Sequence, residues 1–92
     1  MNAPAVSPRV LSKRAGVPSG AVYVGRPSRF GNPFVIGRHG DRAAVVARFE
    51  AWLLDNPALV AAAKAELRGK DLVCWCAPEA CHADVLLRIA NA

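Results

Sequence analysis

Short apolar segments bounded by turn-forming residues divide the chain and predict its strands. Residues 71–75, DLVCW, follow a Gly-Lys break and are apolar at consecutive positions, which is typical of a strand buried on both faces. Residues 21–24, AVYV, are β-branched and aromatic and end at a glycine, so we expect a second strand there. Residues 9–12 fit a short edge strand.

Apolar residues at helical spacing fill the segments between and after these strands. Asp41 is a suitable N-cap for a first helix. Asn56 and Pro57 predict the start of a second helix, which Gly69 should end. We expect a third helix from Pro78, because proline is tolerated in a first turn, with its apolar stripe packed on the sheet.

These elements predict a small single α/β domain with a short, mostly parallel sheet and about three helices packed on it. The segment between the two clear strands is much longer than a hairpin requires, which favours parallel pairing. We expect residues 1–8 to be a flexible N-terminal arm and residues 9–92 to form the domain. Trp52 and Trp75 fit either the core or an interface patch, and we favour the core.

Composition narrows the class of protein. The 92 residues include 53% hydrophobic ones, enough for one modest core, and no apolar run reaches the about 20 residues that span a membrane. No secretory signal is visible, and three cysteines are an odd number, so we expect a cytoplasmic protein without membrane contact. The net charge of +5 favours a nucleotide, a phosphate-bearing small molecule or nucleic acid as partner, although scattered basic residues also fit a solvated surface.

The segment CWCAPEACHADVLL concentrates the chemistry of the chain. Cys74, Cys76, Cys81 and His82 supply three sulfur atoms and one nitrogen, a donor set that suits tetrahedral zinc. On a strand, Cys74 and Cys76 point to the same face about 6–7 Å apart. Against zinc, the usual two-residue gap between paired ligands is absent, and adjacent helical residues diverge by roughly 100°.

Two other interpretations of this segment stay open. Cys81 is a candidate reactive thiolate, because a helix N-terminus and the neighbouring His82 would lower the pKa of its thiol. Alternatively, the cysteines are small buried hydrophobes and His82 is a hydrogen-bonded core residue.

The loop GRPSRFGNPF, residues 25–34, is the second informative stretch. Its glycines and prolines prevent regular structure, and it carries four residues equipped to bind phosphate or carboxylate: Arg26, Ser28, Arg29 and Asn32. The alternative is a structured turn with solvated arginines. Ligands of open α/β sheets bind beyond the carboxyl ends of the strands, and both segments leave such ends. We therefore expect Arg26, Arg29 and Asn32 to face the cysteines and His82.

The two motifs, VYVGRPSRFGNPF and LRGKDLVCWCAPEACHADVL, resemble a small bacterial and bacteriophage family called domain of unknown function 4326. The resemblance covers residues 10–91. The family usually has glycine where this chain has Ala83, which would oppose a close approach of ligand to the backbone there. The resemblance implies a nucleotide or nucleic-acid context and no defined activity.

Three functions follow as hypotheses. In the first, the domain binds or converts a nucleotide-like or other anionic ligand: the arginines hold the anion, Asn32 reads a polar edge, His82 or Asp84 moves a proton, and Cys81 is the nucleophile. In the second, zinc stabilises a module that binds nucleic acid or protein without catalysis. In the third, the chain is a structural accessory protein with buried cysteines.

Overall fold

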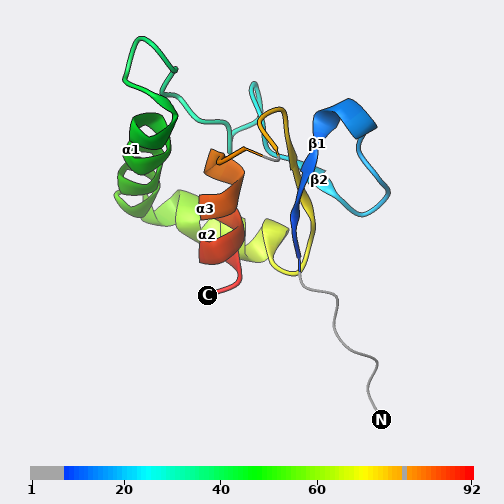
Figure 1. The fold of residues 1–92 in the computed structure, drawn as a ribbon. Helices are drawn as coiled ribbons and strands as arrows, with labels where there is room; N and C mark the ends of the chain where they lie inside the picture. Colours follow the sequence, from blue (N-terminus) through cyan, green and yellow to red (C-terminus); the bar gives the residue numbers. More distant parts are fainter. Residues whose placement is uncertain (1–7, 78) are drawn as a thin grey trace.

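The computed structural model describes residues 8–77 and 79–92, so all but Pro8 of the predicted N-terminal arm lies outside the described residues. In chain order the elements are β1 (Val10–Ser12), a 3-10 helix η1 (Lys13–Ala15), β2 (Val22–Tyr23), α1 (Arg42–Leu54), α2 (Pro57–Leu67), β3 (Leu72–Cys74) and α3 (His82–Ala90) (Figure 1).

The three strands form one parallel sheet in the order β1-β3-β2. Leu72 is paired with Val10 on one side and with Val22 on the other. Every residue of β3 is buried, which explains why this segment is apolar at consecutive positions. The predicted α/β class, the parallel pairing and the buried strand are confirmed.

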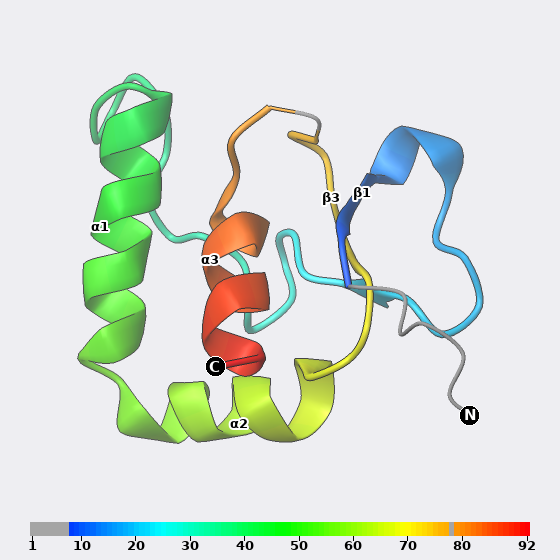
Figure 2. The same cartoon turned by 60° about the horizontal axis from the view of Figure 1, so that its bottom comes forward.

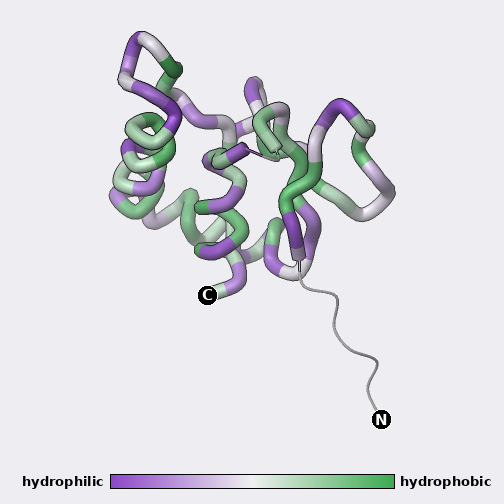
Figure 3. Tube along the Cα trace, viewed as in Figure 1, coloured by the Kyte–Doolittle hydropathy of each residue, from purple (hydrophilic) through white to green (hydrophobic). Residues whose placement is uncertain are grey.

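The helices lie to one side of the sheet. α3 sits between α1 and the strands, and α2 runs across the end of both helices (Figures 1 and 2). The largest side chains with no solvent exposure come from all these elements: Phe49, Leu53, Leu67, Leu72 and Leu86. Each helix carries both hydrophobic and hydrophilic residues (Figure 3), as expected for helices with one buried face.

The first two helices start where the sequence predicts. Asp41 accepts a hydrogen bond from the Ala44 N–H at 2.9 Å and caps α1. α2 begins at Pro57, although the Asn56 side chain makes no capping hydrogen bond. The chain leaves α2 through Gly69, whose φ of +77° is a conformation that favours glycine.

The predicted start of α3 at Pro78 is wrong. The helix begins at His82, and Pro78 itself lies outside the described residues. Cys81 is extended, and its backbone N–H donates to the Asp84 Oδ2 at 2.9 Å. An acidic residue at the third helical position satisfies an otherwise unpaired donor in this way, so the helix starts at this cap rather than at the proline.

The two tryptophans differ in burial. Trp52 is half-buried and packs against Phe49 with ring centroids 5.7 Å apart. Trp75 is 55% exposed, so its predicted place in the core is wrong. β3 ends at Cys74 and the chain bends at Trp75, so the alternation of faces does not continue beyond the strand. None of the helices in the described part of the chain is long and apolar enough to cross a membrane.

Candidate ligand-binding pocket

A pocket lies beyond the carboxyl ends of β2 and β3. These strands are parallel neighbours, and the Val24 N–H extends their pairing by donating to the Val73 carbonyl oxygen at 2.9 Å. The loop that follows β2 and the segment that follows β3 therefore leave the same edge of the sheet. Both contribute residues to the pocket wall, as the position of ligand sites in parallel sheets predicts.

The pocket has a volume of about 160 Å³. Its buried floor is formed by Gly25, Asn32, Val45, Cys74, Cys81 and His82. Its walls and rim are formed by Tyr23, Arg26, Phe34, Ile36, Arg42, Val46, Trp75, Cys76 and Ala80. A cavity of about 150 Å³ is enough to hold benzene. The pocket therefore has room for one ring-sized group, and a larger ligand would extend past the rim.

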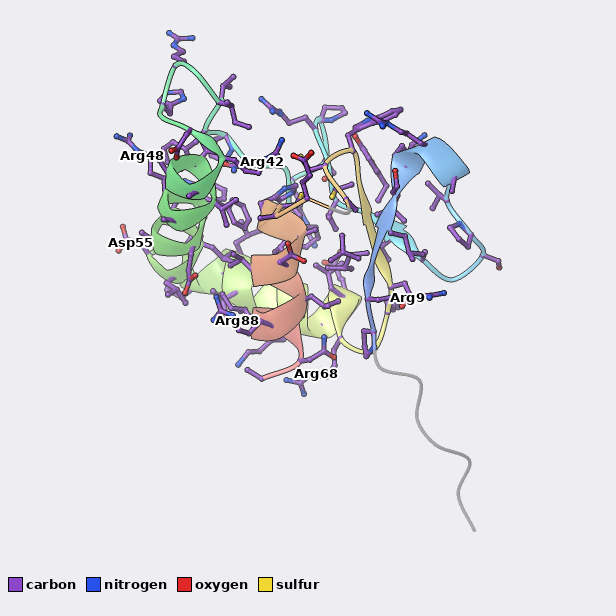
Figure 4. The ribbon with its side chains drawn as sticks, in the orientation of Figure 1. Arg9, Arg42, Arg48, Asp55, Arg68 and Arg88 are labelled. Carbon is purple, nitrogen blue, oxygen red and sulfur yellow. The ribbon has the colours of Figure 1, made fainter. Side chains whose placement is uncertain are left out.

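Two arginines give the rim its positive charge. Arg26 is exposed and makes no ion pair with any described residue. Arg42, the first residue of α1, donates to the Ala80 carbonyl oxygen at 3.2 Å and pairs with Glu79 at 2.9 Å (Figure 4). Arg42 thereby ties the segment before α3 to α1, while Arg26 remains available to a bound anion.

Two predicted ligand-binding residues lie away from this rim. The Arg29 guanidinium pairs with Glu66 of α2 and lies over the Phe30 ring, and Arg29 does not line the pocket. The expectation that Arg29 faces the cysteines is wrong, because Phe30 turns into the core and its neighbour is directed to α2. Ser28 is also outside the pocket wall; its buried hydroxyl makes no hydrogen bond with a described residue.

Asn32 lines the pocket but its side chain is already engaged. Its Nδ2 donates to the Val45 carbonyl oxygen at 3.1 Å, and its Oδ1 accepts from the Phe34 N–H at 2.9 Å. Asn32 is 8% exposed. These bonds fasten the loop to α1, so Asn32 shapes the floor. One Nδ2 hydrogen and one Oδ1 lone pair remain for a ligand.

Cys74 and Cys81 meet at the floor of the pocket. Their Sγ atoms are 2.8 Å apart, and the Cys81 thiol donates to the Cys74 sulfur. Both residues are almost completely buried. Cys76, in contrast, lies after the end of β3 and is half-buried at the wall. The close pair is thus Cys74 with Cys81, and not the two cysteines that share a face in a continued strand.

The hydrogen bond between the thiols separates their acidities. It lowers the pKa of the Cys74 thiol, because the bond stabilises a thiolate on the accepting sulfur. The same bond and burial raise the pKa of Cys81. A backbone N–H in the first turn of α3, that of Ala83, does lower the pKa of Cys81, but the thiol bond and burial outweigh it. The expected net lowering of the Cys81 pKa is therefore wrong, and Cys74 is the better candidate for a thiolate.

His82 is held between the strand edge and the thiols. Its Nε2 lies 2.8 Å from the Val24 carbonyl oxygen, which only accepts, so Nε2 carries the proton. Its Nδ1 then presents a lone pair 3.3 Å from the Cys81 sulfur. Burial lowers the pKa of His82, and the nearby charge of Arg26 acts in the same direction, so the ring is neutral at pH 7.

The predicted zinc ligands are only partly assembled. Cys81 contacts both Cys74 and His82, and Cys76 lines the same pocket. Residues 8–77 and 79–92 hold no cluster of three or more His, Cys, Asp or Glu side chains that meets the geometry of a metal site. Zinc binding stays a prediction.

Asp84 is set apart from the pocket floor. It is exposed, it does not line the pocket, and its carboxylate accepts the Cys81 N–H. Helix capping alone explains why an acidic residue stands three positions after Cys81. Proton transfer by Asp84 stays a prediction, without support from its position.

Sequence reasoning missed the pocket residues Tyr23, Phe34, Arg42 and Trp75. For Arg42 a signal was available: a cation in the first turn of a helix opposes the helix dipole, so it requires another reason to be there. For the aromatic residues no signal separated pocket from core, because both uses demand the same apolar surface.

Residues 10–92 match the family described as Domain of unknown function (DUF4326). The chain belongs to this family. The match spans both motifs, so the pocket is built from residues within the family domain. No curated protein and no solved structure matches the chain.

Proposed function

We propose that the domain binds a nucleotide-like or other anionic small molecule, with its ring in the pocket and its anionic group at Arg26. The observation that carries the proposal is that one ring-sized pocket is lined by two segments distant in sequence, at the carboxyl ends of adjacent parallel strands. Aromatic walls and a few convergent polar groups are typical of small-molecule sites.

The size and charge of the pocket support a nucleotide over a simple anion. A volume of about 160 Å³ exceeds what a phosphate needs and fits a heterocyclic ring. Tyr23, Phe34 and Trp75 offer aromatic surface to such a ring. Arginine binds phosphate through paired N–H donors, so the exposed Arg26 is suited to the charged end of the ligand.

The thiols give this proposal its candidate for covalent chemistry. A ring in the pocket would lie against Cys74 and Cys81, with the His82 Nδ1 close to the Cys81 sulfur. Cys74 would be the nucleophile, because its thiolate is the one that the pair favours. The Cys81 thiol would keep its proton and stabilise that thiolate by donating a hydrogen bond to the Cys74 sulfur.

Thermal shift with a panel of nucleosides, nucleoside phosphates and sugar phosphates tests the proposal. A ligand present at 100 times its Kd stabilises the folded state by about 2.7 kcal/mol, which raises the Tm of a domain of this size by roughly 10–20 °C. Arg26→Ala should remove most of this shift. Arg29→Ala is the matched control, since Arg29 points to α2, and it should leave the shift intact.

Two results would contradict the proposal. One is the absence of any shift across the panel at millimolar ligand. The other is a shift that Arg29→Ala removes and Arg26→Ala does not, because the binding site would then lie on the α2 side of the loop.

A zinc-stabilised module is the second candidate, and the geometry of His82 favours it. Histidines that bind zinc through one ring nitrogen usually donate the other N–H to a carbonyl or carboxylate, as the His82 Nε2 does to Val24. Cys74, Cys81 and the His82 Nδ1 would be three ligands, and Cys76 the fourth. Protein purified without a tag should then contain about one zinc per chain, and chelation should lower its Tm. Metal-free protein with the same Tm would exclude this candidate.

A further inference from the structure

Trp75 is an exposed aromatic residue for which the fold has no packing use. It follows the central strand directly, yet 55% of it is accessible to solvent. It forms part of the pocket rim, and it also lines a second hollow on its other side with Arg14 and Arg42. Large exposed apolar side chains beside a pocket are typical of binding surfaces.

Positive charge surrounds the Trp75 ring. The Lys13 Nζ lies 5.3 Å from the Trp75 ring centroid. Arg14 and Arg42 share the second hollow with Trp75, and Arg26 shares the pocket. The acid in this region is Glu79, and it already pairs with Arg42. The surface around Trp75 therefore attracts anions along its length, and not at one point only.

We propose that the ligand is a stretch of single-stranded nucleic acid, with one base in the pocket and a neighbouring base stacked on Trp75. This inference rests on the proposed nucleotide site. Aromatic side chains bind bases by stacking irrespective of sequence, and basic residues alongside hold the phosphates. A lysine over an exposed ring is held less strongly than a stacked base, so a base can displace Lys13 from Trp75, and Lys13 is then placed to pair with a phosphate.

Charge and shape select this partner over others. A second copy of the chain also carries a net charge of +5, which opposes self-association through this basic surface. A duplex keeps its base faces stacked inside, where neither the pocket nor Trp75 reaches them. A single strand exposes the faces that a pocket and a platform require.

Competition against a fluorescein-labelled oligothymidylate, measured by anisotropy, tests the proposal. The competitors are thymidine monophosphate, the dinucleotide, an eight-residue single strand and a duplex of equal length. The dinucleotide should bind about 5- to 150-fold more tightly than the mononucleotide, which is the gain expected from one stacked base. The duplex should compete more weakly than the single strand.

Variants assign this gain to the surface. Trp75→Ala should lower dinucleotide affinity more than mononucleotide affinity and so remove most of the advantage of the dinucleotide, whereas Trp75→Phe should retain most of the advantage. Lys13→Ala should lower the slope of log K against log salt by about 0.7 for the octamer. Lys70→Ala is the matched control, because Lys70 precedes β3 and lies at the opposite end of the strand from Trp75. It should leave both affinity and slope unchanged.

The outcomes separate this proposal from the one on which it rests. Mononucleotide binding without a gain for the dinucleotide overturns the single-strand site and leaves the pocket proposal standing. Oligonucleotide binding that depends on Trp75, without mononucleotide binding, overturns the pocket as a nucleotide site and, with it, the placement of a base there that this proposal requires. Equal competition by duplex and single strand overturns the stacking mechanism. A dimer in sedimentation that Trp75→Ala abolishes identifies a second copy as the occupant and also overturns the proposal.

Discussion

Accessibility distinguishes the three cysteines. Cys74 and Cys81 are 1% and 2% exposed and lie on the pocket floor, so an alkylating reagent reaches them only through the pocket or when the domain opens. Cys76 is half-buried, lies outside β3 and lines the pocket as well as the hollow beside Trp75. Reagents in solution therefore meet one thiol of the native domain before the other two.

Iodoacetamide under native conditions should modify Cys76 first. We expect a single adduct at early times, located by peptide mass spectrometry at Cys76, and slower labelling of Cys74 and Cys81, because both are almost completely buried. A bound pocket ligand should slow the first reaction, since Cys76 is part of the wall. Labelling of Cys81 ahead of Cys76 would contradict the burial of the thiol pair.

His82 should make stability depend on pH in the weakly acidic range. Burial lowers its folded-state pKa, whereas the unfolded chain has the ordinary value of about 6.5. The stabilisation from the neutral ring is therefore complete above about pH 6.5 and is lost as the pH falls towards the lower folded-state pKa. The free energy of unfolding should decrease by up to about 1.4 kcal/mol per pH unit in that window. Urea titrations at pH 7.5, 6.5 and 5.5 measure this slope; His82→Gln should flatten it, and an equal slope in the variant would exclude His82 as its source.

At the scale of elements, the strands and α1 could be predicted because local rules determine them. A buried central strand requires consecutive apolar residues. Aspartate is a preferred N-cap, so Asp41 directly before a helical segment predicts the start of α1. The start of α3 could not be placed as easily. Proline is typical of a first turn, whereas cysteine is not a preferred N-cap, so the sequence favoured Pro78 over the cap that Cys81 and Asp84 form in the structure.

The same distinction applies to the candidate site. The loops that follow neighbouring parallel strands meet at the carboxyl edge of the sheet because of the topology. Arg26, Asn32 and the cysteines could therefore be predicted to lie at this edge. Which arginine of the loop enters the pocket depends on side-chain direction, and Phe30 decides it by entering the core and carrying Arg29 towards α2. The direction of each side chain is determined by packing, and the spacing of residues in the sequence does not reveal it.

The cap of α3 gives a prediction at this scale. Asp84→Ala removes the acceptor for the Cys81 N–H, so the free energy of unfolding should fall by about 1 kcal/mol. Asp41→Ala is the matched comparison, because it removes the side-chain hydrogen bond that caps the N-terminus of α1, and its cost should be similar. Urea denaturation measures both. No loss of stability in Asp84→Ala would mean that the carboxylate has another role than capping.

At the scale of the whole molecule, α3 joins the pocket to the core. Its first residue, His82, lines the pocket, and the chain after its last turn is tied to the end of α2. Arg68 donates to the Ala90 carbonyl oxygen at 2.8 Å, and the Gly69 N–H donates to the Asn91 Oδ1 at 2.9 Å (Figure 4). Because both ends of α3 are fixed, stability of the helical layer and shape of the pocket are coupled.

Phe49 tests this coupling. It has no solvent exposure and packs edge-to-face against the His82 ring, with centroids 5.0 Å apart. Phe49→Ala should lower the free energy of unfolding by about 3–5 kcal/mol, and Leu53→Ala, one turn further along α1, by about 2–5 kcal/mol. The free energy of unfolding of a domain is about 5–15 kcal/mol, and these losses are a large part of it. Urea titrations are therefore carried out at low temperature, where the variants remain folded and can be compared.

The two variants should differ at the pocket, because only Phe49 contacts His82. At matched stability, adjusted with urea, Cys81 should be alkylated faster in Phe49→Ala than in Leu53→Ala. Equal rates would show that the pocket floor opens only with the whole domain, and that Phe49 stabilises the core without positioning His82.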